Sequence, residues 1–114
     1  MPEDIKRGEI YWVDWNPGRG SEQSGLRPAL VIQNDIGNRY SPTTIVAALT
    51  TAVEKQYPFL VKITARESGL PKDSTVNLAA IMTIDKTRLT EKCGELSEAK
   101  MNEVSEAIKV SLGL

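Results

Sequence analysis

Residues 20–35 read GSEQSGLRPALVIQND, and within them a polar loop meets an apolar strand. Gly20 and Gly25 bracket the loop, and glycine admits backbone angles that side chains forbid. Arg27 stands at the junction, where the following Pro28 restricts it to an extended conformation. Residues 29–32 then predict a short buried strand that ends at a turn.

A guanidinium held rigidly between a loop and a strand is suited to phosphate, because its planar fork pairs with two phosphoryl oxygens. The alternative is an ordinary hairpin loop with an arginine whose stem packs along apolar surface. On these residues alone, we favour the ordinary loop.

Three further blocks lie around this stretch: RGEIYW at residues 7–12, IVAALT at 45–50 and TIDKTRL at 83–89. In order and spacing, all four segments resemble the signature of the MazF/PemK family of toxin endoribonucleases. The resemblance covers nearly the whole chain. It implies an SH3-like small barrel that forms a homodimer, binds a cognate MazE-like antitoxin and cleaves single-stranded mRNA, with UACAU- or ACA-type motifs among the sites cut by relatives.

Length and composition predict a single domain spanning residues 1–114, with 40% hydrophobic and 25% charged residues. No apolar run approaches the ~20 residues of a membrane span, and the polar start of the chain shows no secretory signal. Cys93 is the only cysteine, which fits a reducing cytoplasm. The chain has no histidine, so we expect a site without metal or cofactor.

The charge is balanced, with 14 basic and 15 acidic residues and a net charge of −1. Nucleic-acid-binding domains often carry a basic surplus. An RNA site in this chain is therefore expected to be a local groove in which base recognition matters, with modest affinity for random RNA.

The pattern along the chain is one of short strands followed by a helix. We expect strands at residues 9–15, 28–33, 44–51, 59–64 and 74–83, loops at 34–42 and 66–72, and a helical turn at 86–89. Ser97 is a suitable cap for a final amphipathic helix with an apolar stripe at Met101, Val104, Ile108 and Leu112. The fold class is therefore mainly β with α: an antiparallel sheet with a C-terminal amphipathic helix.

Arg27 and Thr50 match the positions that the family uses for catalysis. Cleavage by the neighbouring 2′-hydroxyl needs a base, an acid and donors to the charged phosphorane. Arg27 can neutralise that charge, and the Thr50 hydroxyl can donate to a phosphate oxygen. Thr50 is alternatively an ordinary β-branched strand residue. Glu22 is a nearby carboxylate that can accept a proton, orient Arg27 or bind a base edge.

In similar proteins the loop around residues 19–23 lines the RNA groove. The resemblance therefore implies that Arg19, Ser21, Glu22 and Gln23 bind RNA. The aromatic residues of the first strand, Tyr11, Trp12 and Trp15, can stack on bases, but we expect most of them to pack in the core.

One segment departs from the family pattern. Close relatives carry a polar Glu-Gln-Ile-Arg run before the Thr-Ile-Asp block, where this chain has Ala79, Ala80, Ile81 and Met82. The loss of three polar side chains puts RNA specificity in question more than the fold. Two alternatives to the endoribonuclease therefore stay open: a non-catalytic toxin of the gyrase-poison type, and an inactive RNA-binding module.

Overall fold

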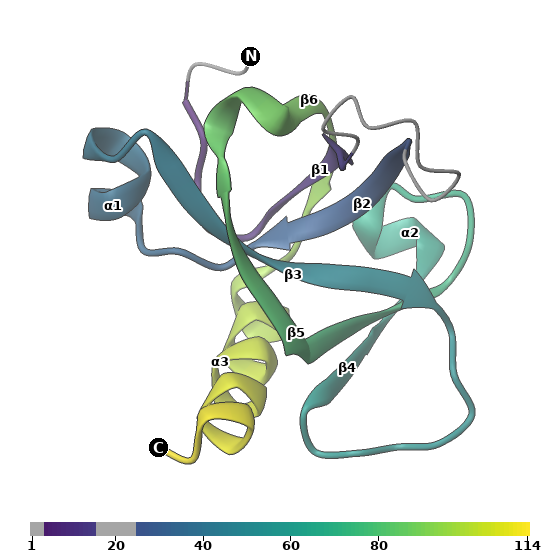
Figure 1. The fold of residues 1–114 in the computed structure, drawn as a ribbon. Helices are drawn as coiled ribbons and strands as arrows, with labels where there is room; N and C mark the ends of the chain where they lie inside the picture. The colour runs from purple at the N-terminus through teal and green to yellow at the C-terminus, as the bar shows by residue number, and fades with distance from the viewer. Residues whose placement is uncertain (1–3, 16–24) are drawn as a thin grey trace.

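Six antiparallel strands form one curled sheet in the computed structural model, which describes residues 4–15 and 25–114 (Figure 1). The sheet order is β4-β5-β3-β2-β1-β6. The strands are β1 (Glu9–Asp14), β2 (Leu26–Val31), β3 (Thr43–Thr51), β4 (Leu60–Ile63), β5 (Ser74–Asp85) and β6 (Leu89–Glu95). The predicted fold class is confirmed, and β3 lies inside the sheet between β2 and β5.

The alternation of side chains along β2 and β3 builds a core on each face of the sheet. Leu30, Ala47 and Leu49 belong to the larger core, which helix α3 (Glu98–Leu112) covers with Met101, Val104 and Ala107. Neighbouring residues of the same strands, among them Val31 and Val46, point to the opposite face. Both faces of the inner strands are buried in this way, as their continuous apolar sequence predicts.

The C-terminal helix begins as predicted. The Ser97 hydroxyl accepts the Lys100 N–H at 3.1 Å, which caps the first turn. Met101 and Val104 are buried and Ile108 is half-buried, but Leu112 is 58% exposed. The predicted stripe therefore ends one turn early. The helical turn expected at residues 86–89 is also present, as η1 (Lys86–Arg88).

Two segments predicted as loops contain helices. The 34–42 loop holds α1 (Asp35–Tyr40), capped by the Asn34 side chain, which accepts the Gly37 N–H at 2.7 Å. The 66–72 loop overlaps α2 (Ala65–Ser68), where Thr64 and Glu67 form a reciprocal capping box. Both predictions were wrong because local caps outweighed the glycine and proline signals. Strand β6 was also missed, because most of its residues are polar and exposed.

Helix α2 closes the curl of the sheet against β6. The two end strands, β4 and β6, do not pair with each other. Instead, the backbone at Gly69, which ends α2, lies directly against the backbone of β6 at Cys93 and Gly94. A Cβ added to Gly69 would lie 2.0 Å from the Cys93 carbonyl oxygen, and one added to Gly94 would lie 2.1 Å from the Ser68 carbonyl oxygen. Only glycine fits at both positions.

Gly69 and Gly113 form a matched pair for testing this closure. Each ends a helix in the left-handed region, with φ of 81° and 72°, but a Cβ at Gly113 would meet nothing within 4 Å. Gly113→Ala should cost about 1 kcal/mol of the free energy of unfolding, from backbone strain alone. Gly69→Ala should cost at least ~3 kcal/mol, because the strand must also move. Urea denaturation of both variants measures the difference, and equal losses would show that the close contact does not hold the curl.

Candidate functional site

Strands β2 and β3 set Arg27 and Thr50 at the same level of the sheet. The two strands pair Val31 with Val46 and Ala29 with Ala48. The pairing stops at Ala29–Ala48, and Arg27 and Thr50 each lie two residues beyond this last pair, at the same end of the two strands. Since side chains alternate along each strand, both residues also project on the face that carries Ala29 and Val46.

Both candidate catalytic side chains are exposed at the ends of strands whose inner parts are buried. Arg27 lies in β2 opposite Val13 of β1, so its predicted extended conformation is confirmed. The Thr50 hydroxyl donates to the Thr51 carbonyl oxygen at 3.2 Å, a local bond that a phosphate oxygen can replace. A rigid sheet thus presents a cation and a hydroxyl donor together at its rim.

Arg19, Ser21, Glu22 and Gln23, predicted to bind RNA, lie outside the described residues. Their assignment stays a prediction. The strands on either side of them, β1 and β2, pair with each other from Ile10 and Leu30 to Asp14 and Leu26. The last of these pairs, Asp14–Leu26, lies next to the Val13–Arg27 pair at one end of the sheet.

The aromatic residues of β1 behave largely as core residues. Tyr11 is 2% exposed, and its hydroxyl donates to Glu9 at 2.9 Å. Burial, together with the Glu9 carboxylate, raises the pKa of Tyr11. Trp12 and Trp15 are half-buried and pack against the two cores. The expectation that most of these residues pack in the core is confirmed.

The segment that departs from the family pattern lies at an irregularity in β5. The β3–β5 pairing passes from Ala47–Ile81 directly to Ala48–Asn77, so Leu78, Ala79 and Ala80 have no partner on β3. Ala79 is exposed and Met82 is 40% exposed, while Ala80 is half-buried. Met82 pairs with Val46, which puts it on the same face as Arg27 and Thr50.

Hollows border Thr50 on both sides of β3. One, of about 270 Å³, is lined by Trp12, Pro28, Leu49 and Leu70 among others. The other, of about 630 Å³, lies between β5 and the β3–β4 connection, with Tyr57, Phe59, Thr75 and Asn77 in its wall. No sequence motif marks these last four residues. The pairing of β3 with β5 brings Thr75 and Asn77 beside Thr50, and Tyr57 and Phe59 lie in the β3–β4 connection.

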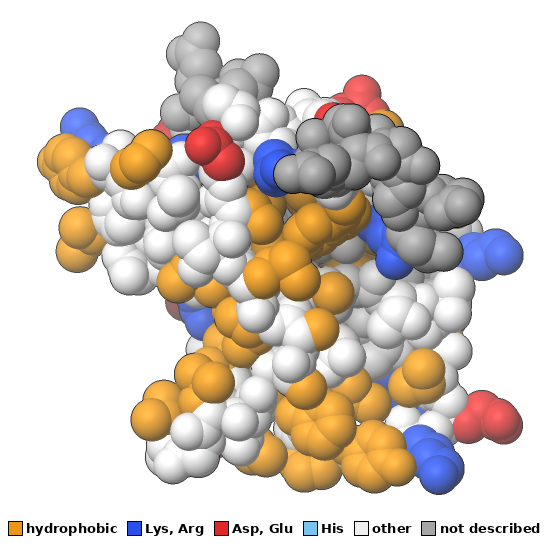
Figure 2. Space-filling model, in the orientation of Figure 1, with side chains coloured by type: hydrophobic (Ala, Val, Ile, Leu, Met, Phe, Trp, Pro, Cys, Tyr) orange, Lys and Arg blue, Asp and Glu red, His pale blue; other side chains and the backbone are white. Residues whose placement is uncertain are grey.

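On the face of the molecule seen in Figure 2, the basic side chains of the described residues are scattered. Hydrophobic side chains run along the middle of this face, and the basic ones lie apart from one another, from its upper left to its lower right. This agrees with the balanced charge of the chain and favours contacts to bases over general attraction to phosphate. Within residues 4–15 and 25–114, no group of three or more Cys, Asp or Glu side chains could hold a metal ion.

The motif at residues 7–12 is structural. Arg7 donates from its backbone N–H to Asp35 at 2.7 Å, from Nε to the Ile32 carbonyl at 2.9 Å, and from a guanidinium nitrogen to Ser105 at 3.1 Å. It joins the start of the chain to α1 and α3. Glu9 is buried and pairs with Lys92 at 2.9 Å, which raises the pKa of Lys92.

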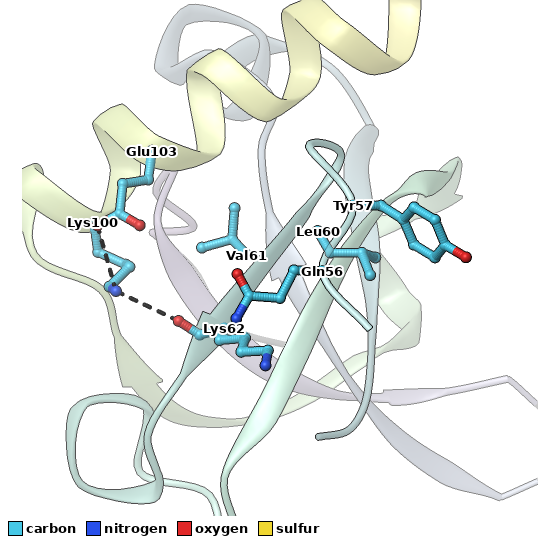
Figure 3. Close-up of a pocket in the computed structure, with 7 residues that line it drawn as sticks. All are labelled: Gln56, Tyr57, Leu60, Val61, Lys62, Lys100 and Glu103. Carbon is cyan, nitrogen blue, oxygen red and sulfur yellow. Dashed lines mark hydrogen bonds and ion pairs between the residues drawn. The ribbon is translucent and has the colours of Figure 1, made fainter. Parts of the chain in front are cut away.

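A further hollow, of about 250 Å³, lies between β4 and α3, with Gln56, Leu60 and Val61 in its wall (Figure 3). Lys100 of α3 reaches across it and donates to the Lys62 carbonyl at 3.4 Å, and also pairs with Glu103 at 3.4 Å. The Lys100 side chain thereby covers part of β4, which is one of the two edge strands of the sheet.

The sequence pattern of the PemK-like, MazF-like toxins of type II toxin–antitoxin systems matches residues 6–112. The chain belongs to this family. It is 51% identical to the Endoribonuclease EndoA of Bacillus subtilis over 111 residues, which cover 96% of each chain. It is also 51% identical to the Endoribonuclease MazF of Staphylococcus epidermidis over 111 residues, covering 96% of this chain and 92% of the relative.

Solved structures of this family have the same fold. The MazE–MazF complex (Form-II) from Deinococcus radiodurans superposes with a TM-score of 0.81 at 26% identity, covering 99% of both chains. An endoribonuclease in complex with its cognate antitoxin, from a mycobacterial species, gives a TM-score of 0.79 at 28% identity, covering 96% of both chains. None of the helices that the structure describes is long and apolar enough to cross a membrane.

Proposed function

We propose that the chain is a sequence-selective, metal-independent endoribonuclease that cleaves single-stranded mRNA, and that it is the toxin of a toxin–antitoxin pair. Arg27 and Thr50 lie exposed on one face of adjacent strands, each two residues beyond the last pair of these strands, and this position carries the proposal. Family membership and relatives named endoribonucleases support it. By analogy with the MazE–MazF complex, its partners are a second copy of the chain and a MazE-like antitoxin, and it acts in the cytoplasm.

In the proposed reaction, the 2′-hydroxyl of the cut nucleotide attacks the adjacent phosphorus, and the 5′-oxygen of the next nucleotide leaves. The new bond closes a 2′,3′-cyclic phosphate, the proton of the 2′-hydroxyl goes to a base, and the leaving oxygen gains a proton. Arg27 and the Thr50 hydroxyl donate to the non-bridging oxygens, which carry more negative charge in the phosphorane than in the substrate. Arginine stays protonated in proteins, so electrostatic stabilisation is its main role.

Cleavage should persist in EDTA and leave a 2′,3′-cyclic phosphate and a 5′-hydroxyl. The reason is that the nucleophile belongs to the substrate. A matched RNA with hydrogen in place of the 2′-hydroxyl at the cut nucleotide should not be cut. Mass spectrometry of the products, together with a gel of the deoxy substrate, checks both expectations. Cutting of the deoxy substrate would contradict the mechanism.

Arg27→Ala and Thr50→Ala should each lower kcat/KM by ~10²-fold or more, which is typical for the loss of a transition-state donor. Because both side chains are exposed, the melting temperature should change little. In the double variant, kcat/KM should fall by much less than the product of the two single losses, because the effects of groups that act on one phosphorane are not additive. Arg39→Ala, which changes an exposed arginine on α1, is the control. Normal cleavage by folded Arg27→Ala would remove this assignment.

The β5 segment tests RNA selectivity. The triple change Ala79→Glu, Ala80→Gln and Met82→Arg restores the polar run of relatives at positions of which two are exposed. Each good base contact is worth ~1–3 kcal/mol of discrimination, so the natural chain should accept a broader motif and the triple variant a narrower one. The added arginine should also steepen the salt dependence.

Mapping cleavage ends on a long RNA, beside a thermal melt, measures the effect of the triple change. An unaltered map in a stable triple variant would show that these positions do not read RNA. RNA binding by the natural chain without cleavage would favour the inactive binding module, and neither binding nor cleavage would favour the gyrase-poison type.

A further inference from the structure

The 630 Å³ hollow beside Thr50 combines features that suit a flat aromatic ligand. Two of its wall residues, Tyr57 and Phe59, stack in parallel with ring centroids 5.4 Å apart and an interplanar angle of 2°. Tyr57 is 45% exposed, so part of its ring remains open to a further stacking partner. In Figure 3 the Tyr57 ring points away from Lys100 and Glu103 of α3.

Polar groups stand in the same hollow with fixed orientation. The Asn77 side chain accepts the Ala79 N–H at 2.9 Å through Oδ1, which sets the direction of its amide. Among the described residues, no hydrogen bond from the Asn77 Nδ2 donors is found. Thr75, which pairs with Thr50 across the β3–β5 ladder, is fully buried, and its Oγ1 has no hydrogen-bond partner within the described parts of the chain. A buried polar atom without a partner is rare in proteins, and Thr75 Oγ1 is such an atom in the wall of the hollow.

We propose that this hollow binds one nucleobase of the RNA strand, stacked on Tyr57 and read by the Asn77 amide. Thr50 lines the hollow and is also the proposed phosphate donor, so a nucleotide whose phosphate lies at Thr50 has its base within reach of Asn77. Stacking is tolerant of base identity, whereas the Asn77 donors favour a base with a carbonyl acceptor, as uracil has, over adenine. The usual pairing of asparagine with adenine also needs the amide oxygen, and Ala79 already occupies Oδ1 of Asn77. Asn77 is thus a specificity-determining residue. The inference rests on the proposed ribonuclease function and deepens it.

The experiment uses the full-length chain and a long single-stranded RNA in EDTA, with cleavage ends mapped by sequencing. Tyr57→Ala should lower kcat/KM about tenfold without changing the sites cut, because a stacking surface is lost. Asn77→Asp keeps the Oδ1 acceptor for Ala79 but has no amide donors, so it should change the base preferred at one position of the cut site. Tyr40→Ala, at a 76% exposed tyrosine on α1, is the matched control and should leave both readouts unchanged.

Equilibrium binding of the same RNA with hydrogen at the cut 2′ position separates this inference from the ribonuclease activity. Tyr57→Ala should weaken that binding about tenfold even if the natural chain cuts nothing. Suppose that the natural chain cuts RNA, and that the Tyr57→Ala and Asn77→Asp variants are folded and show unchanged cleavage maps and binding. This result would overturn the nucleobase subsite and leave the ribonuclease proposal intact. A natural chain that binds but does not cut would contradict the activity, and weakened binding by Tyr57→Ala would still support the subsite.

Discussion

The hydrogen-bonded register of β3 between β2 and β5 is the constraint on which the rest of the molecule depends. A shift of one residue would turn each side chain of β3 to the opposite face, so Ala47 and Leu49 would leave the core beneath α3. The same shift would turn Thr50 away from Arg27 and from Asn77. The apolar packing that fixes the strand is therefore also what orients the groups at its exposed end. Arg27 and Thr50 are thus held by paired strands and not by loops.

The sequence predicts the fold well where apolar residues alternate or run continuously. Strand β3, the Ser97 cap and the Met101–Val104 face of α3 are examples, because burial outweighs every other preference there. It fails where a polar side chain decides the structure. Asn38 is buried in α1 and accepts from Thr44 at 2.7 Å and from Gln33 at 3.0 Å, which turns an apparent loop into an anchored helix. The prediction also misses strand β6, because its sequence carries no apolar pattern and its pairing with β1 makes it a strand.

The candidate site was predictable only in part, for a different physical reason. Arg27 and Thr50 can be identified in the sequence only through the family resemblance. The β2–β3 pairing then explains why two residues 23 positions apart can act together. Tyr57, Thr75 and Asn77 carry no recognisable motif. Their proximity follows from the pairing of β5 with both β3 and β4, and from an irregularity at Ala79 that no propensity scale encodes.

The closing contact between Gly69 and Gly94 has a consequence for synthesis of the chain. Strands β2 and β3 leave the ribosome early, but β1 receives its second partner only when β6 follows, and the curl cannot close against α2 before that. Contacts between distant parts of a chain also form slowly, because closing the intervening segment into a loop costs entropy before the contact is made. A nascent chain that carries Arg27 and Thr50 but ends before Gly94 therefore lacks the finished scaffold. The scaffold around Arg27 and Thr50 is thus finished only after residue 94 has been synthesised.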